Sequence, residues 1–251
     1  MPDGICPAKV IVLTLERAKA RQARIKSLLD SAGIPFEFFW GVDGQRDPNP
    51  IEPFYDEKKR LRVKGAPLSQ GQLGCFASHY RIWQKCLQEN QNLVILEDDV
   101  IFDEGLFKIF LKNIPELPQE AGCVRLFENK TRNHKAFEYA QLKGLRLLRY
   151  TKGPMSTMGY YLTPGAAEKF IESVRPVFLS VDIYMDRYWS NKVLCCGVEP
   201  GFVYHDHQFE SMIGYAEKTQ RRTIVVTILR ELFTLGERIQ RYVYNRKFRS
   251  K

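Results

Sequence analysis

The sequence lacks several features that would assign it to a common class of protein. It has no run of about 18 apolar residues, so we expect no helix that spans a membrane. It has no G-x-x-x-x-G-K-[ST] loop and no G-x-G-x-x-G after a strand, so neither glycine-rich phosphate loop is indicated. A G-x-S-x-G elbow is also absent, which argues against a serine hydrolase.

Cysteine gives no sign of a disulfide framework or a zinc site. The six cysteines form no C-x-x-C pair, and most lie inside apolar segments. This usage favours reduced, buried thiols. Residues Met1 to Lys9 also lack the basic region, apolar stretch and small-residue cleavage site of a secretory signal. We therefore expect a cytoplasmic protein.

Positive charge is concentrated at the carboxyl end. The 251 residues carry a net charge of +9, and residues 218–251 hold ten basic and two acidic side chains, which is +8. The remaining 217 residues carry only +1. We expect residues 1–217 to form the globular domain and residues 218–251 to form a basic helical extension.

The extension has the pattern of a long amphipathic helix. Apolar residues recur at spacings of three and four, as on one face of a helix: Ile224, Ile228, Leu232, Leu235, Ile239 and Tyr242. Such a helix could lie on an anionic membrane surface, or it could pack on the body or form a homodimer. Nucleic acid is not indicated as a partner, because the body has no basic stripe or recognition motif.

The amino-terminal half predicts an α/β fold with a mostly parallel sheet. Lys9–Leu15 is typical of a strand, Glu16–Ala32 of a helix and Phe36–Val42 of a second strand, which together make a βαβ unit. The proline-rich stretch Gln45–Leu68 predicts a long surface connection. Apolar spacing then indicates a helix over Ser69–Glu89.

Three adjacent acids mark the most informative position. Asn92–Leu96 predicts a buried strand, and Glu97, Asp98 and Asp99 follow at its carboxyl end, where α/β sheets bind ligands. Like charges at the edge of an apolar core resist ionisation unless a cation neutralises them. Mg²⁺ or Mn²⁺, held by one or two carboxylates and substrate phosphates, would do so. The alternative is a turn or helix start capped by acids.

Three histidines have open interpretations. His205 and His207 flank Asp206 in a polar cluster, and either could be a second-side metal ligand. A simple surface loop explains them equally well. His79 lies beside the core stripe of the helix over Ser69–Glu89, where a hydrogen-bonded histidine at the edge of the core is the usual case.

Two further acids lie four residues apart in Leu179–Arg187. Asp182 and Asp186 would share one face if this segment is helical. Asp182 follows an apolar stretch and is a candidate buried general base. Asp186 stands beside Arg187 and is more typical of a solvated ion pair.

Seven segments in this order match the motifs of one family. They are Val10–Arg17, Phe38–Gly44, Leu68–His79, Val94–Val100, Thr157–Ala166, Ser180–Asp182 and Gln208–Ser211. Together they resemble glycosyltransferase family 25, the bacterial lipooligosaccharide transferases related to procollagen galactosyltransferases. The resemblance implies a GT-A-like fold, use of a nucleotide sugar, commonly UDP-galactose, and inversion at the anomeric centre.

The resemblance also implies roles for individual residues. Glu97, Asp98 and Asp99 would be the DxD-like metal site, with Asp99 the closest match to the direct Mn²⁺ (or Mg²⁺) ligand. From the residues themselves we expect Glu97 or Asp98, and His205 or His207, as candidates to help hold the ion. Asp182 would be the catalytic base. The residues implied to line the donor site are Leu13, Thr14, Arg17, Gly74, Ser78, His79, Glu97 and Asp98.

The sequence therefore predicts an inverting, metal-dependent hexosyltransferase. Its expected partners are a UDP-sugar donor, a lipooligosaccharide acceptor and, through the basic helix, an anionic membrane at the cytoplasmic face of the inner membrane. Two alternative functions remain, one that would use the same acidic triplet and one that would tolerate the loss of Asp98 and Asp99. They are a metal-dependent phosphohydrolase and a non-catalytic carbohydrate- or membrane-binding protein.

Overall fold

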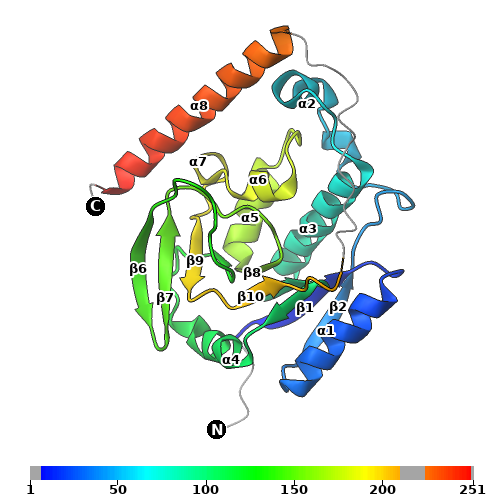
Figure 1. The fold of residues 1–251 in the computed structure, drawn as a ribbon, viewed down its shortest axis with the longest axis vertical. Helices are drawn as coiled ribbons and strands as arrows, with labels where there is room; N and C mark the ends of the chain where they lie inside the picture. Colours follow the sequence, from blue (N-terminus) through cyan, green and yellow to red (C-terminus); the bar gives the residue numbers. More distant parts are fainter. Residues whose placement is uncertain (1–6, 210–223, 250–251) are drawn as a thin grey trace.

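The computed structural model of the chain describes residues 7–209 and 224–249 (Figure 1). One large sheet runs through the molecule. In spatial order its strands are β2 (Phe36–Trp40), β1 (Lys9–Thr14), β3 (Leu93–Glu97), β8 (Gly159–Leu162), β5 (Cys123–Arg125), β9 (Cys196–Glu199), β7 (Leu145–Tyr150) and β6 (Ala136–Leu142). A second, two-stranded sheet pairs β10 (Val203–His205) with β4 (Val100–Phe102).

The large sheet is mixed. The pairs β1–β2, β1–β3 and β5–β9 are parallel, and the other four neighbouring pairs are antiparallel. Only β8 and β7 run against the rest, so six of the eight strands share one direction. The predicted α/β fold with a mostly parallel central sheet is confirmed, and it begins with the predicted βαβ unit.

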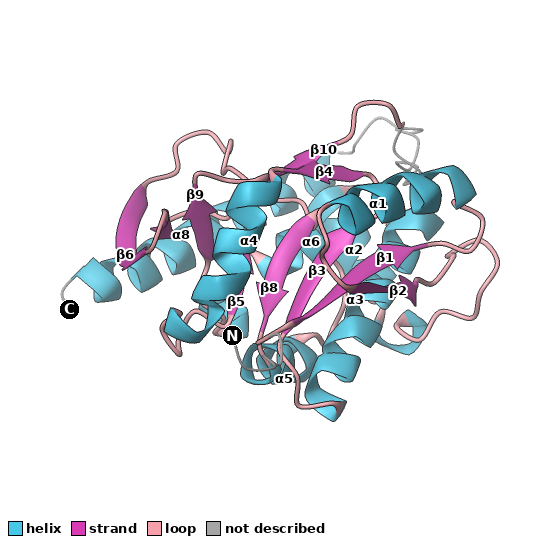
Figure 2. Ribbon diagram, turned by 90° about the horizontal axis from the view of Figure 1, so that it is seen from below, coloured by secondary structure: helices cyan, strands magenta, loops and turns pink. Residues whose placement is uncertain are grey.

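Helices cover both faces of this sheet (Figure 2). They are α1 (Lys19–Ser31), α2 (Glu57–Lys64), α3 (Gln70–Gln88), α4 (Glu104–Asn113), α5 (Pro164–Ser173), α6 (Val181–Met185), α7 (Tyr188–Asn191) and α8 (Ile224–Arg249), with 3-10 turns at Glu52–Phe54 and Ile114–Glu116. Among the described residues, no helix combines the length and the apolar character needed to cross a membrane.

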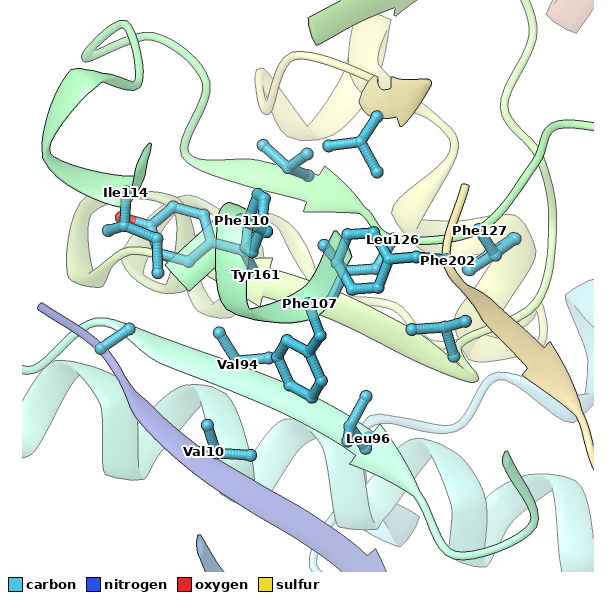
Figure 3. Packing of buried hydrophobic residues seen from close by; sticks show 14 of the residues in the cluster. Val10, Val94, Leu96, Phe107, Phe110, Ile114, Leu126, Phe127, Tyr161 and Phe202 are labelled. Carbon is cyan, nitrogen blue, oxygen red and sulfur yellow. The ribbon is translucent and has the colours of Figure 1, made fainter. Parts of the chain in front are cut away.

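Alternation along β1 divides the core into two layers. Val10 and Val12 point to one side, where they join Phe107 and Phe110 of α4 (Figure 3). Ile11 and the neighbouring apolar residues point to the other side, toward α3 and α5. Successive side chains of a strand face opposite sides of a sheet, so a strand buried on both faces is apolar throughout. This explains the continuous apolar run of the first strand.

Helix α3 forms where the apolar spacing predicts it. Ser69 begins it with a capping box: the Ser69 hydroxyl accepts from the Gln72 amide, and the Gln72 side chain accepts from the Ser69 amide. Its buried face includes Phe76 and Trp83. Trp83 packs against Phe170 of α5 with ring centroids 4.8 Å apart. The helix thereby fixes the second core layer.

The long surface connection predicted over Gln45–Leu68 contains helical structure that the sequence did not predict. The segment contains a 3-10 turn and α2. Asp56 caps α2 by accepting from the Lys59 amide, and Gly65 ends it in the left-handed conformation at φ 77°. The helix has no buried residue of its own, so apolar periodicity could not reveal it. It packs against α8, which is distant in sequence.

Gly74 fixes how closely α3 approaches the loop that follows β2. A Cβ atom there would lie 2.6 Å from the amide nitrogen of Gly44 and 2.7 Å from the carbonyl oxygen of Val42. Both obstacles are backbone atoms, which cannot rotate away. The contact therefore needs glycine.

We predict that Gly74→Ala destabilises the protein by about 1–3 kcal/mol, because overpacking against backbone forces a shift. Gly165→Ala is the matched control, since a Cβ on that glycine of α5 meets nothing within 4 Å. Alanine should gain up to about 1 kcal/mol there from helix propensity. Urea unfolding of both variants checks this, and equal effects at the two positions would contradict the account of Gly74.

Candidate active site

A cavity of about 930 Å³ opens at the carboxyl ends of β1 and β3. Its lining comes from segments far apart in the sequence: the end of β1, the start of α3, the acidic triplet, residues 155–157, the start of α6 and residues 205–207. Ligands of α/β sheets bind outside the carboxyl ends of the strands. The cavity therefore lies where the sequence predicts chemistry.

Asp98 holds the acidic triplet to the first βα unit. One of its oxygens accepts from the Thr14 hydroxyl at 2.6 Å, and the other accepts from Nη1 of Arg21 at 3.0 Å. The same Nη1 donates to Oδ2 of Asp99 at 3.0 Å. Arg21, on α1, was not among the predicted site residues. In the sequence, Arg21 stands among polar residues of a predicted helix. This pattern is typical of a solvent-exposed side chain, so nothing indicated a role in the site.

Asp99 is the one carboxylate among the described residues with a buried oxygen that has no hydrogen-bond partner. Burial, the largest cause, and the negative charge of Glu97 raise the pKa of Asp99, Arg21 lowers it, and the net result is a pKa of about 6. Its Oδ2 bonds to Arg21, but its Oδ1 is buried without a hydrogen-bond partner among the described residues. A buried acceptor with no partner is costly. This oxygen is available to a cation or to another ligand.

Glu97 has different partners. It accepts from the Thr157 hydroxyl at 2.5 Å, and Nε2 of His79 lies 3.7 Å from the same oxygen. Burial raises the pKa of Glu97, but His79 and Thr157 lower it more, so the net shift is downward. Glu97 therefore stays ionised beside Asp99, which explains part of the raised pKa of Asp99.

The structure brings residues 205–207 to the acidic triplet. Pairing of β10 with β4 sets His205 opposite Val100, and the Asp206 amide donates to the carbonyl of Asp99 at 2.8 Å. His205 and His207 are exposed and line the cavity. The charge of His205 is a smaller cause that lowers the pKa of both Glu97 and Asp99.

Asp182 lines the same cavity from the first turn of α6. Its Oδ2 accepts from the Ser156 amide at 3.5 Å, a long contact that leaves the carboxylate accessible to another donor. The candidate base and the acidic triplet are thus on walls of one cavity, although 83 residues separate Asp182 from Asp99 in the sequence.

The expectation that Asp186 forms a solvated pair with Arg187 is wrong. Asp186 is buried and accepts from Nη2 of Arg125 at 3.0 Å and from the Met155 amide at 2.7 Å. Arg187 instead bonds to Glu237 of α8. The turn that ends α6 directs Asp186 inward, where Arg125 of β5 is a fully buried cation that requires an anion.

This buried ion pair supports a strained part of the cavity wall. Met155 and Ser156 have φ angles of 57° and 68°, which are unfavourable for residues other than glycine. Asp186 accepts from the Met155 amide, and Nη1 of Arg125 donates to the Ser156 carbonyl at 3.0 Å. Strain of this kind persists only where the surroundings enforce it, and it is concentrated at functional sites.

The other predicted donor-site residues divide into two groups. Leu13, Arg17 and Ser78 line the cavity, and Arg17 donates to Asp43 at 2.7 Å. Gly74 and His79 do not line it. Gly74 packs on backbone, as described above, and Nδ1 of His79 bonds to the Tyr160 hydroxyl at 2.8 Å behind Glu97.

The side chains fit a hard divalent cation bound together with a phosphate ligand. Among residues 7–209 and 224–249, no three His, Cys, Asp or Glu side chains gather as a complete protein metal site. Mg²⁺ and Mn²⁺ in nucleotide sites need only one or two carboxylates, since phosphates and water complete the shell. The unpartnered Oδ1 of Asp99, in a cavity that Glu97 and His205 also line, matches that requirement.

The model of glycosyltransferase family 25 (LPS biosynthesis protein) matches residues 8–185. This range includes β1, the acidic triplet and Asp182, so it contains most of the cavity wall. The chain belongs to this family, and the resemblance predicted from its motifs is confirmed.

Several curated relatives are similar over much of the chain. The lipooligosaccharide biosynthesis protein lic2B of Haemophilus influenzae is 26% identical, with 96% of each chain covered. Human procollagen galactosyltransferase 2 is 24% identical over 89% of this chain and 39% of its own length. A glycosyltransferase 25 family member of Aedes aegypti is 27% identical over 75% of this chain and 32% of its own length. The chain thus spans about a third of that insect relative.

Among solved structures, a glycosyltransferase involved in the glycosylation of the major capsid of PBCV-1 was matched. It is 12% identical with a TM-score of 0.25, and the match covers 64% of this chain and 62% of that one.

We predict that Asp99→Asn raises the stability of the metal-free protein at neutral pH. The folded pKa of about 6 lies above the unfolded value of 3.8, so ionising Asp99 between these values weakens the folded state. Asparagine removes that penalty, which is about 1–3 kcal/mol. The gain should be present above about pH 6 and should vanish near pH 4.

Denaturant unfolding with a chelator present, at both ends of this pH window, measures the effect. Asp30→Asn is a control, because Asp30 is an exposed carboxylate paired with Lys26 on the surface of α1. A loss of stability in Asp99→Asn at neutral pH would show that the Arg21 pair outweighs the repulsion in the triplet.

Proposed function

We propose that this family 25 glycosyltransferase is an inverting, metal-dependent enzyme that transfers galactose from UDP-galactose to a sugar of a lipooligosaccharide core. The observation that carries the proposal is the cavity that joins the unpartnered Asp99 oxygen to Asp182. The names of lic2B and procollagen galactosyltransferase 2 support the acceptor and the sugar, respectively.

In this proposal Asp99 holds Mn²⁺ or Mg²⁺, with Glu97 and His205 or His207 close by. The ion, when bound, supplies positive charge that stabilises the negative charge of the departing nucleotide diphosphate. Arg21 keeps Asp98 and Asp99 in place beneath the cavity. The end of β1 and Arg17 form the wall beside this floor.

Asp182 acts as the general base. An inverting transfer needs one carboxylate to accept the proton of the attacking hydroxyl, and no covalent intermediate is formed. Asp182 has only the long contact to the Ser156 amide, so its oxygens can accept from a substrate hydroxyl. The Arg125–Asp186 pair holds the backbone of Met155 and Ser156, and this fixes the wall against which Asp182 is oriented.

The first test is donor turnover. Purified protein is incubated with a panel of UDP-sugars and Mn²⁺, with and without truncated lipooligosaccharide. We expect UDP release from UDP-galactose that requires the metal and is lost in Asp99→Ala, while Asp30→Ala retains it, because only Asp99 faces the cavity.

Other outcomes of this test would contradict the proposal in distinct ways. Release that water supports better than any sugar acceptor would indicate a phosphohydrolase. No release from any donor, with folded protein and acceptor present, would favour a non-catalytic binding protein.

Asp182→Asn tests the base separately from the metal. We expect kcat to fall by about 10²–10⁴-fold, the usual contribution of a general base, while donor binding is retained. Glu168→Gln, an exposed carboxylate on α5, is the matched control and should leave kcat unchanged. Steady-state kinetics and UDP titration measure the two quantities. Wild-type turnover in Asp182→Asn would remove this residue from the role.

A further inference from the structure

Helix α8 is attached to the body by one side only. Glu237 accepts two hydrogen bonds from Arg187, at 2.7 and 2.9 Å. Phe233 packs edge-on against Phe178 with ring centroids 5.9 Å apart, and Tyr244 packs against Tyr188 at 5.1 Å. The helix runs along the edge of the molecule beside α2 and α7 (Figure 1). These contacts fix which side of α8 faces outward.

The outward side is apolar. Nine of the fifteen large apolar side chains that are exposed in the described residues belong to this helix, with exposed fractions from 38% to 80%. They are Ile224, Val225, Ile228, Leu229, Leu232, Leu235, Ile239, Tyr242 and Val243, and we call them the α8 stripe. A surface helix ordinarily turns its apolar side to the core. In α8 the broad apolar side faces solvent instead. A contiguous exposed apolar patch of this kind marks an interaction site.

Helix α8 carries basic side chains as well as the α8 stripe. Arg238 and Lys247 are exposed, and Arg241 lies over the ring of Trp189. Burial lowers the pKa of Lys152, and the positive charges of Arg241 and Arg238 lower it further, so the basic charges of the helix add to those of the body.

The described part of α8 holds six basic and only two acidic side chains, so its acids neutralise only part of the positive charge. Within the described part of the helix, Glu237 bonds to Arg187 and Glu231 bonds to Arg230. The surface around the stripe therefore keeps a net positive charge and is complementary to an anionic one.

This charge distribution distinguishes between two candidate partners that could cover the α8 stripe. A second copy of the chain, related by a two-fold axis, would bring the same patch and the same positive charges together. An anionic membrane supplies both an apolar layer and negative headgroups, and each basic residue near such a surface favours binding. The 26-residue helix is about 39 Å long, and its inner side is held by the body through Phe233, Glu237 and Tyr244, so it can only lie in the plane of the membrane.

We infer that α8 is a membrane-docking helix, which places the α8 stripe at the boundary between headgroups and acyl chains of an anionic phospholipid bilayer. The inference goes beyond the proposed catalytic function and is independent of it, because no residue of the stripe lines the cavity. It would hold the enzyme at a surface where an amphiphilic acceptor is anchored.

Vesicle co-sedimentation of the full chain tests the inference. Vesicles of phosphatidylcholine alone are compared with vesicles that also contain phosphatidylglycerol, at low and high salt. We expect binding only to the anionic vesicles, weakened by salt. The triple variant Ile228→Ser, Leu232→Ser and Ile239→Ser should bind at least about tenfold more weakly, because it removes three of the nine apolar side chains of the stripe.

Two further variants separate the contributions. Arg238→Gln should weaken binding about fivefold, from the usual contribution of one basic residue at an anionic surface. Leu87→Ser is the matched control, since Leu87 is exposed at the end of α3, and it should bind as wild type. Thermal melting of each variant shows that it is folded.

Three results would overturn the inference. They are absence of wild-type binding to anionic vesicles, unchanged binding in the triple variant, and a wild-type dimer that the triple variant converts to monomer without any vesicle binding. Donor turnover in solution is measured in parallel. It should be equal in the wild type and the triple variant, so failure of vesicle binding and failure of the catalytic proposal are distinguishable.

Discussion

The crowding of three carboxylates at the end of a buried strand is the constraint on which the site depends. Glu97, Asp98 and Asp99 follow four apolar residues of β3 that are fully buried, so their charges meet at the edge of the core. Arg21 is bonded to two of them, and Thr14 completes the partners of Asp98. One buried cation does not balance three acids, and Asp99 keeps an unpartnered oxygen and a raised pKa. The protein thus retains an unfavourable charge where a ligand can relieve it.

The rest of the molecule positions this charge opposite a second wall. β1 and α1 bring Thr14 and Arg21 to the triplet, while β10 brings residues 205–207 to its other side. Across the cavity, the buried Arg125–Asp186 pair holds two residues in the left-handed conformation beside Asp182. Each wall therefore combines a buried ion pair with an energetically unfavourable feature. In one wall it is the unpartnered Asp99 oxygen, and in the other it is the left-handed backbone of Met155 and Ser156. Such features are typical of sites that lower stability in return for function.

Much of this arrangement was predictable because it depends on short-range patterns. Continuous apolar runs predict strands buried on both faces, so β1 and β3 were found, and the acids after β3 indicated the site. Apolar spacing predicts α3 with nearly its observed ends. The short strand β8, at the centre of the sheet, was missed because four residues show no periodicity. The α8 periodicity was read correctly, but which side of the helix packs depends on Phe233 and Glu237 meeting distant residues.

The partners of individual charges were the least predictable feature. Asp186 stands next to Arg187, yet it bonds to Arg125, which lies 61 residues away. Arg21 resembles any basic residue of a solvated helix, yet it lies within 3.0 Å of both Asp98 and Asp99. Only the tertiary fold determines which cation a buried acid meets, because desolvation makes an unpaired charge far more costly than a long loop between partners.

Calorimetric titration of UDP into the protein, with and without Mn²⁺, tests the central claim most directly. The claim is that Asp99 remains unsatisfied so that a metal and a nucleotide can bind together. It predicts that Mn²⁺ strengthens UDP binding by about tenfold or more in the wild type and has no effect in Asp99→Asn, which stays folded. UDP binding that is equally tight without metal, or a full Mn²⁺ effect in Asp99→Asn, would contradict it.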